Sequence, residues 1–558
     1  MSKITSNNDN YELYKDISPF FLKDILIKLA KGDKNHTILN AGRGNPNFFN
    51  KFCRRVFNIF SLIVMDLTDN VKSGYNDLVY YKKPNDFKKL YKSLKTKISN
   101  SKLFKDDIEK QFLLNYLDYL AKQSPNANST IYNLITSTYG CFYPTPPQIQ
   151  PHVEYIIRDY MFNLIYNGVD TKDTPKDYEY FLTEGAAAGI LYVFNTLSIN
   201  KLLVKGDTIA IITPIFSPYL EMPKLKMYGL NIIELKGRPE NNYALQDEDI
   251  NKLKNPEIKA LFCVNPTNPS AFCLPQENIK KIGRIVKKYR SDLIIVSDCV
   301  YSPFVKKFNS LLQTCPKNTI EIFSLSKYFG TTGWRLGITM IRKDNNFGYL
   351  FKTLSTKNIN NLKDRYELVS IKPNNLDMMT RIVMDSRQVA EEHVGGLSTP
   401  QQVLIGLFLF YDYYEEKNGP IIGNKTYKKR IHNILDKRID NLYKPLGIKP
   451  NKSSISTEYY ALLPIIEIVD KVFNGKGKEL KQKSNYINFL TYLASKYHIV
   501  LLPGKGFGSK PWYLRVSLAN LADDEYITIG NAIHNTIKDI LGIKESNSSD
   551  SSSSDDSI

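Results

Sequence analysis

The clearest sign of chemistry in this sequence is a lysine placed at the end of an apolar run. Lys327 follows the run IEIFSLS. A lysine in such a position needs a partner or the loss of its charge, because burying an ammonium group is costly. A neutral, desolvated lysine is a nucleophile suited to forming a Schiff base. Gly330, Gly333 and then Arg335 follow within eight residues, so we expect a nucleophilic lysine in a tightly turned segment.

Two further segments place polar or small residues directly after apolar runs. Asp298 closes the run LIIVS and is followed by Tyr301, in the pattern D-x-x-Y. An aspartate at that place also suits a simple cap or turn. The segment TEGAAAG, residues 183–189, opens a helix with small residues, which lets backbone N–H groups approach a phosphate. Alone, this segment is weak evidence, because small residues are common where helices begin.

The middle third of the chain supplies the elements that must position these residues. Short β-rich apolar runs recur there, and several are separated by helical or turn-rich stretches such as residues 277–290. Strands that alternate with helices predict a largely parallel α/β sheet with helices on both faces. Such sheets bind ligands at the carboxyl ends of their strands, where Asp298 and Lys327 lie. The expected strands are residues 208–213, 231–235, 259–264, 293–298, 320–326 and 336–341.

Together these segments resemble the fold-type I pyridoxal phosphate enzymes of the aspartate aminotransferase superfamily. The strongest shared motif is S-x-S-K-x-x-G-x-x-G-W-R-x-G at residues 324–337, and the resemblance extends over residues 15–540. It implies a doubly wound, mostly parallel sheet with a second, smaller α/β domain, pyridoxal 5'-phosphate as cofactor and no metal ion. The active site of this fold lies between two subunits, so a homodimer or a larger homo-oligomer is expected.

The same resemblance implies roles for individual residues. Lys327 resembles the Schiff-base lysine, Asp298 the carboxylate paired with the pyridine nitrogen, and Tyr301 a donor to the cofactor's phenolic oxygen; these are the expected catalytic residues. An aspartate at the pyridine nitrogen keeps it protonated, so that the ring can accept electrons. Ala271 stands where the family usually has glycine after N-P-[ST]. The other expected cofactor contacts are Asn268 at the phenolic oxygen, Phe216 stacked on the pyridine, Tyr143 reaching the neighbouring subunit's phosphate, and Gly185, Ala186, Ala187, Ser324 and Arg335 at the phosphate.

Further features resemble the aspartate 4-decarboxylase family, whose members release CO₂ from aspartate to give alanine and also transaminate aspartate. They are residues 18–30, 39–50 and 385–402 and the length of the chain, 558 residues. Arg515, in WYLRVSLANL, resembles the arginine that binds the substrate α-carboxylate. Small amino acids and keto acids are the expected substrates. An aspartate or aromatic aminotransferase without decarboxylation is the alternative, because it would share every cofactor residue.

A dicarboxylic substrate also needs a cation for its distal carboxylate. Gly44, in NAGRGNPN, corresponds to the family glycine that packs against the substrate, so Arg43 must lie close by. Arg387 and Lys23 are the other candidates. We rank Arg387 above Lys23, because a lysine in SPFFLKDIL also suits a solvated helix face.

The resemblance and the composition together suggest how the chain is organised. Residues 131–395 are expected to form the large cofactor-binding domain, and residues 15–70 with 400–545 the small domain. Residues 71–130, rich in lysine and asparagine, predict a helical insertion. Residues 546–558 are serine and acidic residues that cannot bury apolar surface, which predicts a disordered tail.

Composition and charge exclude several other classes of protein. The net charge is +19, but the basic residues are scattered and carry no nucleic-acid-binding signature. The six cysteines form no metal-binding spacing, which predicts free thiols in a reducing compartment. The polar start lacks a signal peptide, and the longest apolar runs, such as residues 403–411, are half a membrane span. We expect a cytoplasmic enzyme with neither nucleic acid nor membrane as partner.

Overall fold

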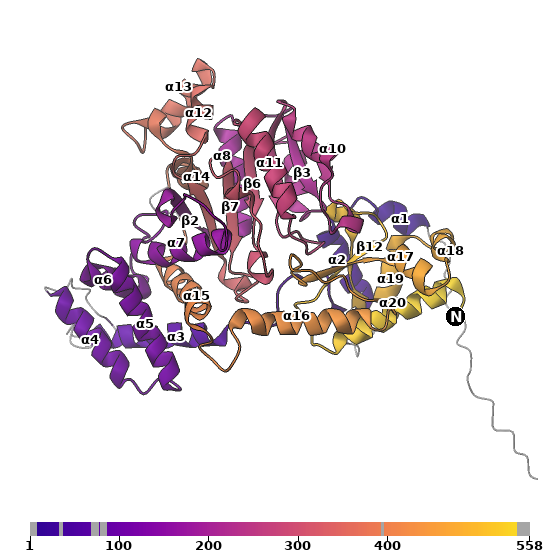
Figure 1. The fold of residues 1–558 in the computed structure, drawn as a ribbon, viewed down its shortest axis with the longest axis horizontal. Helices are drawn as coiled ribbons and strands as arrows, with labels where there is room; N and C mark the ends of the chain where they lie inside the picture. Colours follow the sequence, from indigo (N-terminus) through magenta and orange to yellow (C-terminus); the bar gives the residue numbers. More distant parts are fainter. Residues whose placement is uncertain (1–7, 33–36, 69–77, 79–85, 392–395, 544–558) are drawn as a thin grey trace, which may run out of the picture. The chain divides into compact units, whose positions relative to one another are not determined.

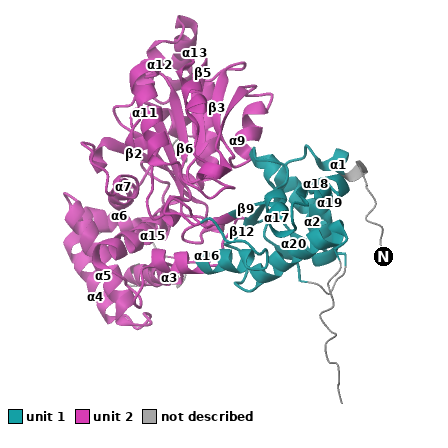
Figure 2. Ribbon diagram, turned by 45° about the vertical axis from the view of Figure 1, so that its right-hand side comes forward, with its two compact units in different colours: residues 1–43, 435–451, 461–558 teal, residues 44–434, 452–460 magenta. Residues whose placement is uncertain are grey.

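The computed structural model describes residues 8–32, 37–68, 78, 86–391 and 396–543. The predicted tail, 546–558, lies outside the described residues, as does most of the first part of the predicted insertion. The chain forms two compact units (Figure 2). The small unit comprises residues 1–43, 435–451 and 461–558, and the large unit comprises residues 44–434 and 452–460.

The large unit is built on a seven-stranded sheet (Figure 1). Its strands lie in the order β2-β8-β7-β6-β5-β3-β4. The strands from β7 to β4 run parallel to one another, whereas β8 is antiparallel to both β7 and β2. The predicted, largely parallel α/β sheet is therefore confirmed. The strands are β2 Tyr178–Glu184, β3 Thr208–Thr213, β4 Asn231–Lys236, β5 Ile258–Val264, β6 Ile294–Asp298, β7 Thr319–Ser324 and β8 Leu336–Arg342.

Helices pack against this sheet through their apolar side chains. Helix α11 (Gln276–Tyr289) buries Ile279, Ile282 and Val286 on one side, and these side chains belong to a core shared with β5 and β6. Helix α8 (Ala186–Ile199) follows β2 and packs against β2, β7 and β8. The other helices around the sheet are α7 Pro151–Tyr166, α9 Pro218–Glu221, α10 Asp247–Asn251, α12 Phe347–Lys352, α13 Thr356–Tyr366 and α14 Met378–Ser386.

A second group of helices in the large unit packs around α15, which is buried along most of its length. The described part of the predicted insertion, residues 86–130, is helical. Residues 44–68 and 400–434, which the sequence assigns to the small domain, lie in the large unit. The physical reason is that α3 packs on α15 and α6. The helices are α3 Lys51–Met65, α4 Phe87–Asn100, α5 Asp107–Gln123, α6 Ala127–Tyr139 and α15 Thr399–Asn418.

The small unit contains two short sheets. Strand β1 pairs parallel with β10, and β12 lies between β11 and β9. Helix α19 packs against α2 and α20, which closes an apolar core. Helix α16 and strand β9 begin in residues of the large unit. The elements are α1 Asn8–Tyr14, α2 Pro19–Ala30, β1 Leu39–Asn40, α16 Tyr427–Tyr443, β9 Tyr460–Pro464, α17 Ile465–Val472, α18 Gly477–Lys483, α19 Tyr486–Tyr497, β10 Ile499–Val500, β11 Leu502–Pro503, β12 Tyr513–Ser517 and α20 Glu525–Leu541.

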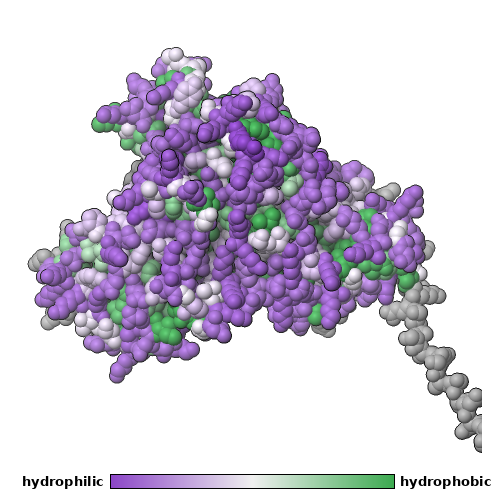
Figure 3. Space-filling model, viewed as in Figure 1, coloured by the Kyte–Doolittle hydropathy of each residue, from purple (hydrophilic) through white to green (hydrophobic). Residues whose placement is uncertain are grey.

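The visible face of the molecule is mainly hydrophilic, with scattered apolar residues (Figure 3). In the described ranges, no helix combines the length and the apolar character needed to cross a bilayer. Those ranges also contain no group of three or more side chains that could hold a metal ion. All six cysteines are free thiols, as predicted.

Candidate active site

Lys327 projects from the turn that follows β7 and meets the backbone of a segment far away in sequence. Its Nζ donates a hydrogen bond to the carbonyl oxygen of Gly44 at 3.0 Å. The Tyr459 hydroxyl donates to the same oxygen at 2.9 Å. The structure thus brings together two residues of the predicted site, the lysine and the glycine, within the large unit.

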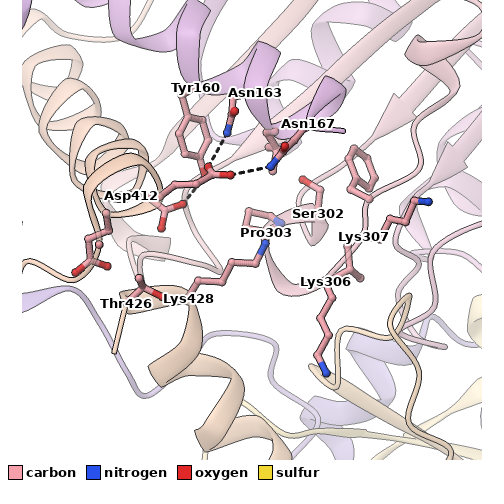
Figure 4. Close-up of a pocket in the computed structure, with 16 residues that line it drawn as sticks. Tyr160, Asn163, Asn167, Ser302, Pro303, Lys306, Lys307, Asp412, Thr426 and Lys428 are labelled. Atoms are coloured by element: carbon pink, nitrogen blue, oxygen red, sulfur yellow. Dashed lines mark hydrogen bonds between the residues drawn. The ribbon is translucent and has the colours of Figure 1, made fainter. Parts of the chain in front are cut away.

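The segment that carries Lys327 is also anchored to two helices. The Tyr328 hydroxyl donates to Asp412 of α15 at 2.8 Å, and the Tyr160 hydroxyl of α7 donates to Asp412 at 3.2 Å. These side chains of α7 and α15 border a cavity of about 450 Å³ (Figure 4). Burial raises the pKa of Asp412 to about 6. The sequence marks this part of α15 only as an apolar run, so the anchoring was not predicted.

Asp298 ends β6 with its side chain buried, at 4% exposure. Its carboxylate accepts hydrogen bonds from the Val300 N–H at 3.1 Å and from the Tyr219 hydroxyl at 3.3 Å. Burial raises the pKa of this carboxyl from 3.8 to about 6, although Lys327 acts in the opposite direction. The ionised form is therefore costly unless a cation stands beside it. Tyr219 was missed from sequence, because a tyrosine in an apolar segment resembles an ordinary core residue.

Tyr301 belongs to a cluster of three buried tyrosines. Its hydroxyl forms a hydrogen bond of 2.8 Å with the Tyr460 hydroxyl. The rings of Tyr301, Tyr459 and Tyr460 pack with centroids 5.0, 5.2 and 5.6 Å apart. Tyr460 also lies against Gly44, since a Cβ at that glycine would stand 2.7 Å from its hydroxyl oxygen. Tyr301 was predicted from its spacing to Asp298, whereas Tyr459 and Tyr460 lie in a segment that carries no motif.

The turn between β2 and α8 requires glycine. Gly185 caps α8 with φ of +84°, and a Cβ there would stand 2.5 Å from Nη2 of Arg335. The same Nη2 donates to the carbonyl oxygen of Glu184 at 3.2 Å. A Cβ at Gly337 would stand 2.5 Å from the carbonyl carbon of Gly185, so two backbones meet here. This close approach places the arginine side chain beside the N-terminus of α8.

These groups fit pyridoxal phosphate. The first-turn N–H groups of a helix have no acceptor within it, so those of Ala186 and Ala187 suit a phosphate together with the Arg335 guanidinium. Ser324 is buried at the end of β7. It pairs with Gly337 of β8, which in turn pairs with Thr183 of β2, two residues before Gly185. The buried Asp298 carboxylate needs a cation, and a protonated pyridine nitrogen is one.

The remaining predicted cofactor residues lie in loops of the large unit. Asn268 is buried at 3% exposure, and Phe216, which follows β3, is half-buried. Ala271 has φ of +68°, a left-handed conformation that favours glycine, which agrees with the glycine usual at this place in the family. Tyr143 is 71% exposed and stands beside the exposed Phe142. An exposed ring of this kind is available to a neighbouring subunit.

Arg387 is engaged with groups of its own unit. It forms an ion pair with Glu184 and donates to the Tyr192 hydroxyl at 3.0 Å. Tyr192 in turn donates to Glu184 at 3.0 Å. Because a carboxylate already neutralises its charge, Arg387 is less suited to a substrate carboxylate than the sequence suggested.

In the small unit, Arg515 of β12 is only 1% exposed. Its Nη2 donates to the Gly42 carbonyl oxygen at 2.6 Å, and its guanidinium lies 4.9 Å from the centroid of the Phe507 ring. Lys23 of α2 lies against the same glycine, since a Cβ at Gly42 would stand 3.4 Å from its Cγ, and it pairs with Asp24 at 3.3 Å. A buried guanidinium with an apolar wall is suited to binding a carboxylate.

Comparison with known proteins agrees with this geometry. The family model for class I and II aminotransferases matches residues 135–533. A Pseudomonas protein described as a bifunctional aspartate aminotransferase and L-aspartate beta-decarboxylase is 34% identical over 530 residues, which cover 94% of this chain and 96% of that protein. An aspartate/prephenate aminotransferase of Thermus thermophilus is 25% identical over 166 residues, 29% of this chain and 40% of that protein.

Solved structures show the same fold. The aspartate aminotransferase of Thermus thermophilus with maleate has a TM-score of 0.57 and 14% identity, and the match covers 96% of this chain and 100% of that one. An aspartate aminotransferase of Thermotoga maritima has a TM-score of 0.54 and 17% identity, covering 94% and 97% of the two chains. The predicted fold class is therefore confirmed.

Proposed function

Because this chain belongs to the family of class I and II aminotransferases, we propose that it is an aspartate 4-decarboxylase. It converts L-aspartate into L-alanine and CO₂ and transaminates aspartate more slowly. The observation that carries the proposal is the 34% identity to the bifunctional Pseudomonas protein over 94% of the chain. An aspartate aminotransferase without decarboxylation is the second candidate, because relatives that match shorter parts of the chain carry that name.

Product analysis with L-aspartate tests the proposal. In the absence of a keto acid, alanine should accumulate as aspartate is consumed. When a keto acid is added, oxaloacetate should appear in addition, at a lower rate. Oxaloacetate formation without any alanine would favour the second candidate.

We propose pyridoxal 5'-phosphate as the cofactor. When bound, it supplies an electron sink for the substrate carbon atoms that lose a proton or CO₂. Lys327 would hold it covalently, Asp298 would face its pyridine nitrogen, and the turn at Gly185 would hold its phosphate. The other proposed contacts are Ala186, Ala187, Phe216, Asn268, Tyr301, Ser324 and Arg335, with Tyr143 serving the neighbouring subunit.

The side chains of this protein then orient the substrate and move its protons. Lys327 Nζ takes the proton from the substrate Cα and later returns one. Asp298 holds the proton on the pyridine nitrogen, since its buried carboxylate is stabilised by an adjacent positive charge. Arg515 binds the α-carboxylate through its planar fork. The distal carboxylate must be desolvated and loosely held, because tight ion pairing would stabilise the charge that departs with CO₂.

We propose Arg43 as the cation for the distal carboxylate. It is exposed and precedes Gly44, whose carbonyl oxygen accepts the Lys327 hydrogen bond. Within the described residues Arg43 forms no ion pair, whereas Arg387 pairs with Glu184 and Lys23 is held beside Gly42. An arginine without a fixed carboxylate partner can bind that of the substrate and release it.

Replacing the two substrate arginines should separate their roles. We expect Arg515→Ala to weaken all amino-acid substrates, and Arg43→Ala to weaken only dicarboxylic ones. Losing one such charged contact costs about 1.5–3 kcal/mol, or about 10- to 150-fold in kcat/KM. Steady-state kinetics with aspartate and with a monocarboxylic amino acid measure the difference. Arg284→Ala, on the exposed side of α11, is the control. Equal losses for both substrates in Arg43→Ala would contradict its role.

Gly44→Ala should also impair turnover. The added Cβ would stand 2.7 Å from the Tyr460 hydroxyl and 3.5 Å from Lys327 Nζ, so the tyrosine has to move. Overpacking of this kind costs about 1–3 kcal/mol, from which we expect an approximately 10- to 100-fold loss of kcat/KM. Gly348→Ala, in α12, is the matched control, because nothing lies within 4 Å of a Cβ there and the residue is outside the proposed site. Wild-type kinetics in Gly44→Ala would show that Tyr460 is not held against this glycine in the enzyme.

We further propose that the enzyme is a homodimer or a larger homo-oligomer in the cytoplasm. The exposure of Tyr143 supports a neighbouring subunit. The six free cysteines support a reducing compartment, where disulfides do not persist. Size-exclusion chromatography with light scattering measures the assembly directly.

A further inference from the structure

We propose that Tyr460 is a positioning residue that sets how strongly Tyr301 donates to the cofactor, and so sets the pH at which the bound cofactor titrates. The inference rests on the proposed cofactor and extends the proposed function to a residue outside the family motifs. Tyr460 acts through Tyr301, with which it shares a hydrogen bond, and not on the substrate.

The contact between the two tyrosines is short and enclosed. Their hydroxyl oxygens lie 2.8 Å apart, and the side chains are 5% and 3% exposed. A hydrogen bond in such surroundings is electrostatically stronger than one in water. Tyr460 cannot easily move away, because its ring also packs against Tyr459 with centroids 5.0 Å apart.

The direction of this hydrogen bond follows from the number of protons available. A phenol has one O–H, so a Tyr301 that donates to the cofactor's phenolic oxygen must accept from Tyr460. Accepting a hydrogen bond polarises the Tyr301 O–H and makes it a stronger donor. A stronger donor stabilises the cofactor's deprotonated, negatively charged oxygen. The bound cofactor therefore loses its proton at a lower pH when Tyr460 is present.

Gly44 explains how the Tyr460 hydroxyl reaches this position. The Cβ of any larger residue in place of Gly44 would stand 2.7 Å from the Tyr460 hydroxyl oxygen. Two other polar side chains lie near the pair: Lys327, whose Nζ donates to the Gly44 carbonyl oxygen, and Tyr459, whose ring packs against both tyrosines. Both are unchanged in every variant, so a change made at Tyr460 alone reports its own contribution.

A spectrophotometric pH titration of the cofactor-loaded enzyme tests the proposal. We expect Tyr460→Phe to raise the midpoint of the change in visible absorbance by about 0.3–1 pH unit, since one unit corresponds to about 1.36 kcal/mol. Tyr366→Phe is the matched control: it also removes a buried hydroxyl, whose hydrogen bond to Asp385 is 2.8 Å long, and it should leave the midpoint unchanged.

Tyr460→3-fluorotyrosine keeps the ring and the hydroxyl and supplies a more acidic, stronger donor. We expect it to lower the midpoint, so the proposal stays testable if Tyr460→Phe folds poorly. A midpoint that is unchanged in both variants, or that also shifts in Tyr366→Phe, would overturn the role of Tyr460. A wild-type protein without any visible cofactor band would instead overturn the proposed cofactor, so the two failures are distinguishable.

Discussion

Lys327→Ala should abolish both the visible absorbance of the lysine-linked cofactor and the turnover of aspartate. The reason is that one amino group is proposed to hold the cofactor covalently and to move the substrate's Cα proton. Loss of a general base alone costs about 10²–10⁴-fold in rate. The fold should survive, because the hydrogen bond from Lys327 Nζ to the Gly44 carbonyl oxygen contributes only about 1 kcal/mol.

Absorption spectra and single-turnover kinetics of the purified variant measure both losses. Lys352→Ala, at an exposed position in the last turn of α12, is the control for removing a lysine elsewhere in the large unit. A Lys327→Ala enzyme that retained its absorbance band and its activity would disprove the assignment of the cofactor lysine.

Asp298→Asn should lower kcat by about 10²–10³-fold, as is typical when one preorganised electrostatic group is removed from an active site. The amide has nearly the same size as the carboxyl group and can still accept from the Val300 N–H. What disappears is the negative charge that holds the pyridine proton. Near-normal turnover would show that Asp298 is not the partner of the pyridine nitrogen.

Without the cofactor, Asp298→Asn should increase the stability of the protein, although it lowers turnover in the cofactor-loaded enzyme. Burial raises the pKa of Asp298 from 3.8 to about 6, so the folded protein binds a proton that the unfolded chain has released. Stability therefore falls as the pH rises from about 4 to 6. The shift of about two units corresponds to about 3 kcal/mol. Urea unfolding should find cofactor-free Asp298→Asn more stable than wild type at pH 8, and this gain should vanish at pH 4.

The sequence predicted those parts of the site that are local along the chain. The strand ending at Asp298, the lysine after the next strand and the glycine turn at Gly185 each combine an apolar run with polar residues that follow it. Such a pattern fixes which end of the sheet carries the chemistry, because parallel strands share their carboxyl edge. All six predicted strands are present in the structure, because each is a short apolar run that the sheet can bury.

Contacts between distant segments could not be predicted in this way. Tyr460 meets Tyr301 across 159 positions of the chain, and nothing in its own segment sets it apart from an ordinary strand residue. Likewise, the pairing of Arg387 with Glu184 depends on how α8 and α14 pack, which no local pattern specifies. That α3 belongs to the large unit depends on its packing against α15, which no local pattern specifies either.

The fate of the two carboxyl groups of aspartate distinguishes a 4-decarboxylase from an aminotransferase. Samples of L-aspartate labelled with ¹³C at C1 or at C4 are incubated with the enzyme without a keto acid, and the products are followed by NMR. The proposed 4-decarboxylase should release labelled CO₂ from the C4-labelled sample only, and the C1-labelled sample should give alanine labelled in its carboxyl group. If neither sample releases CO₂, while oxaloacetate forms once a keto acid is added, the protein is an aminotransferase and the decarboxylase account is wrong.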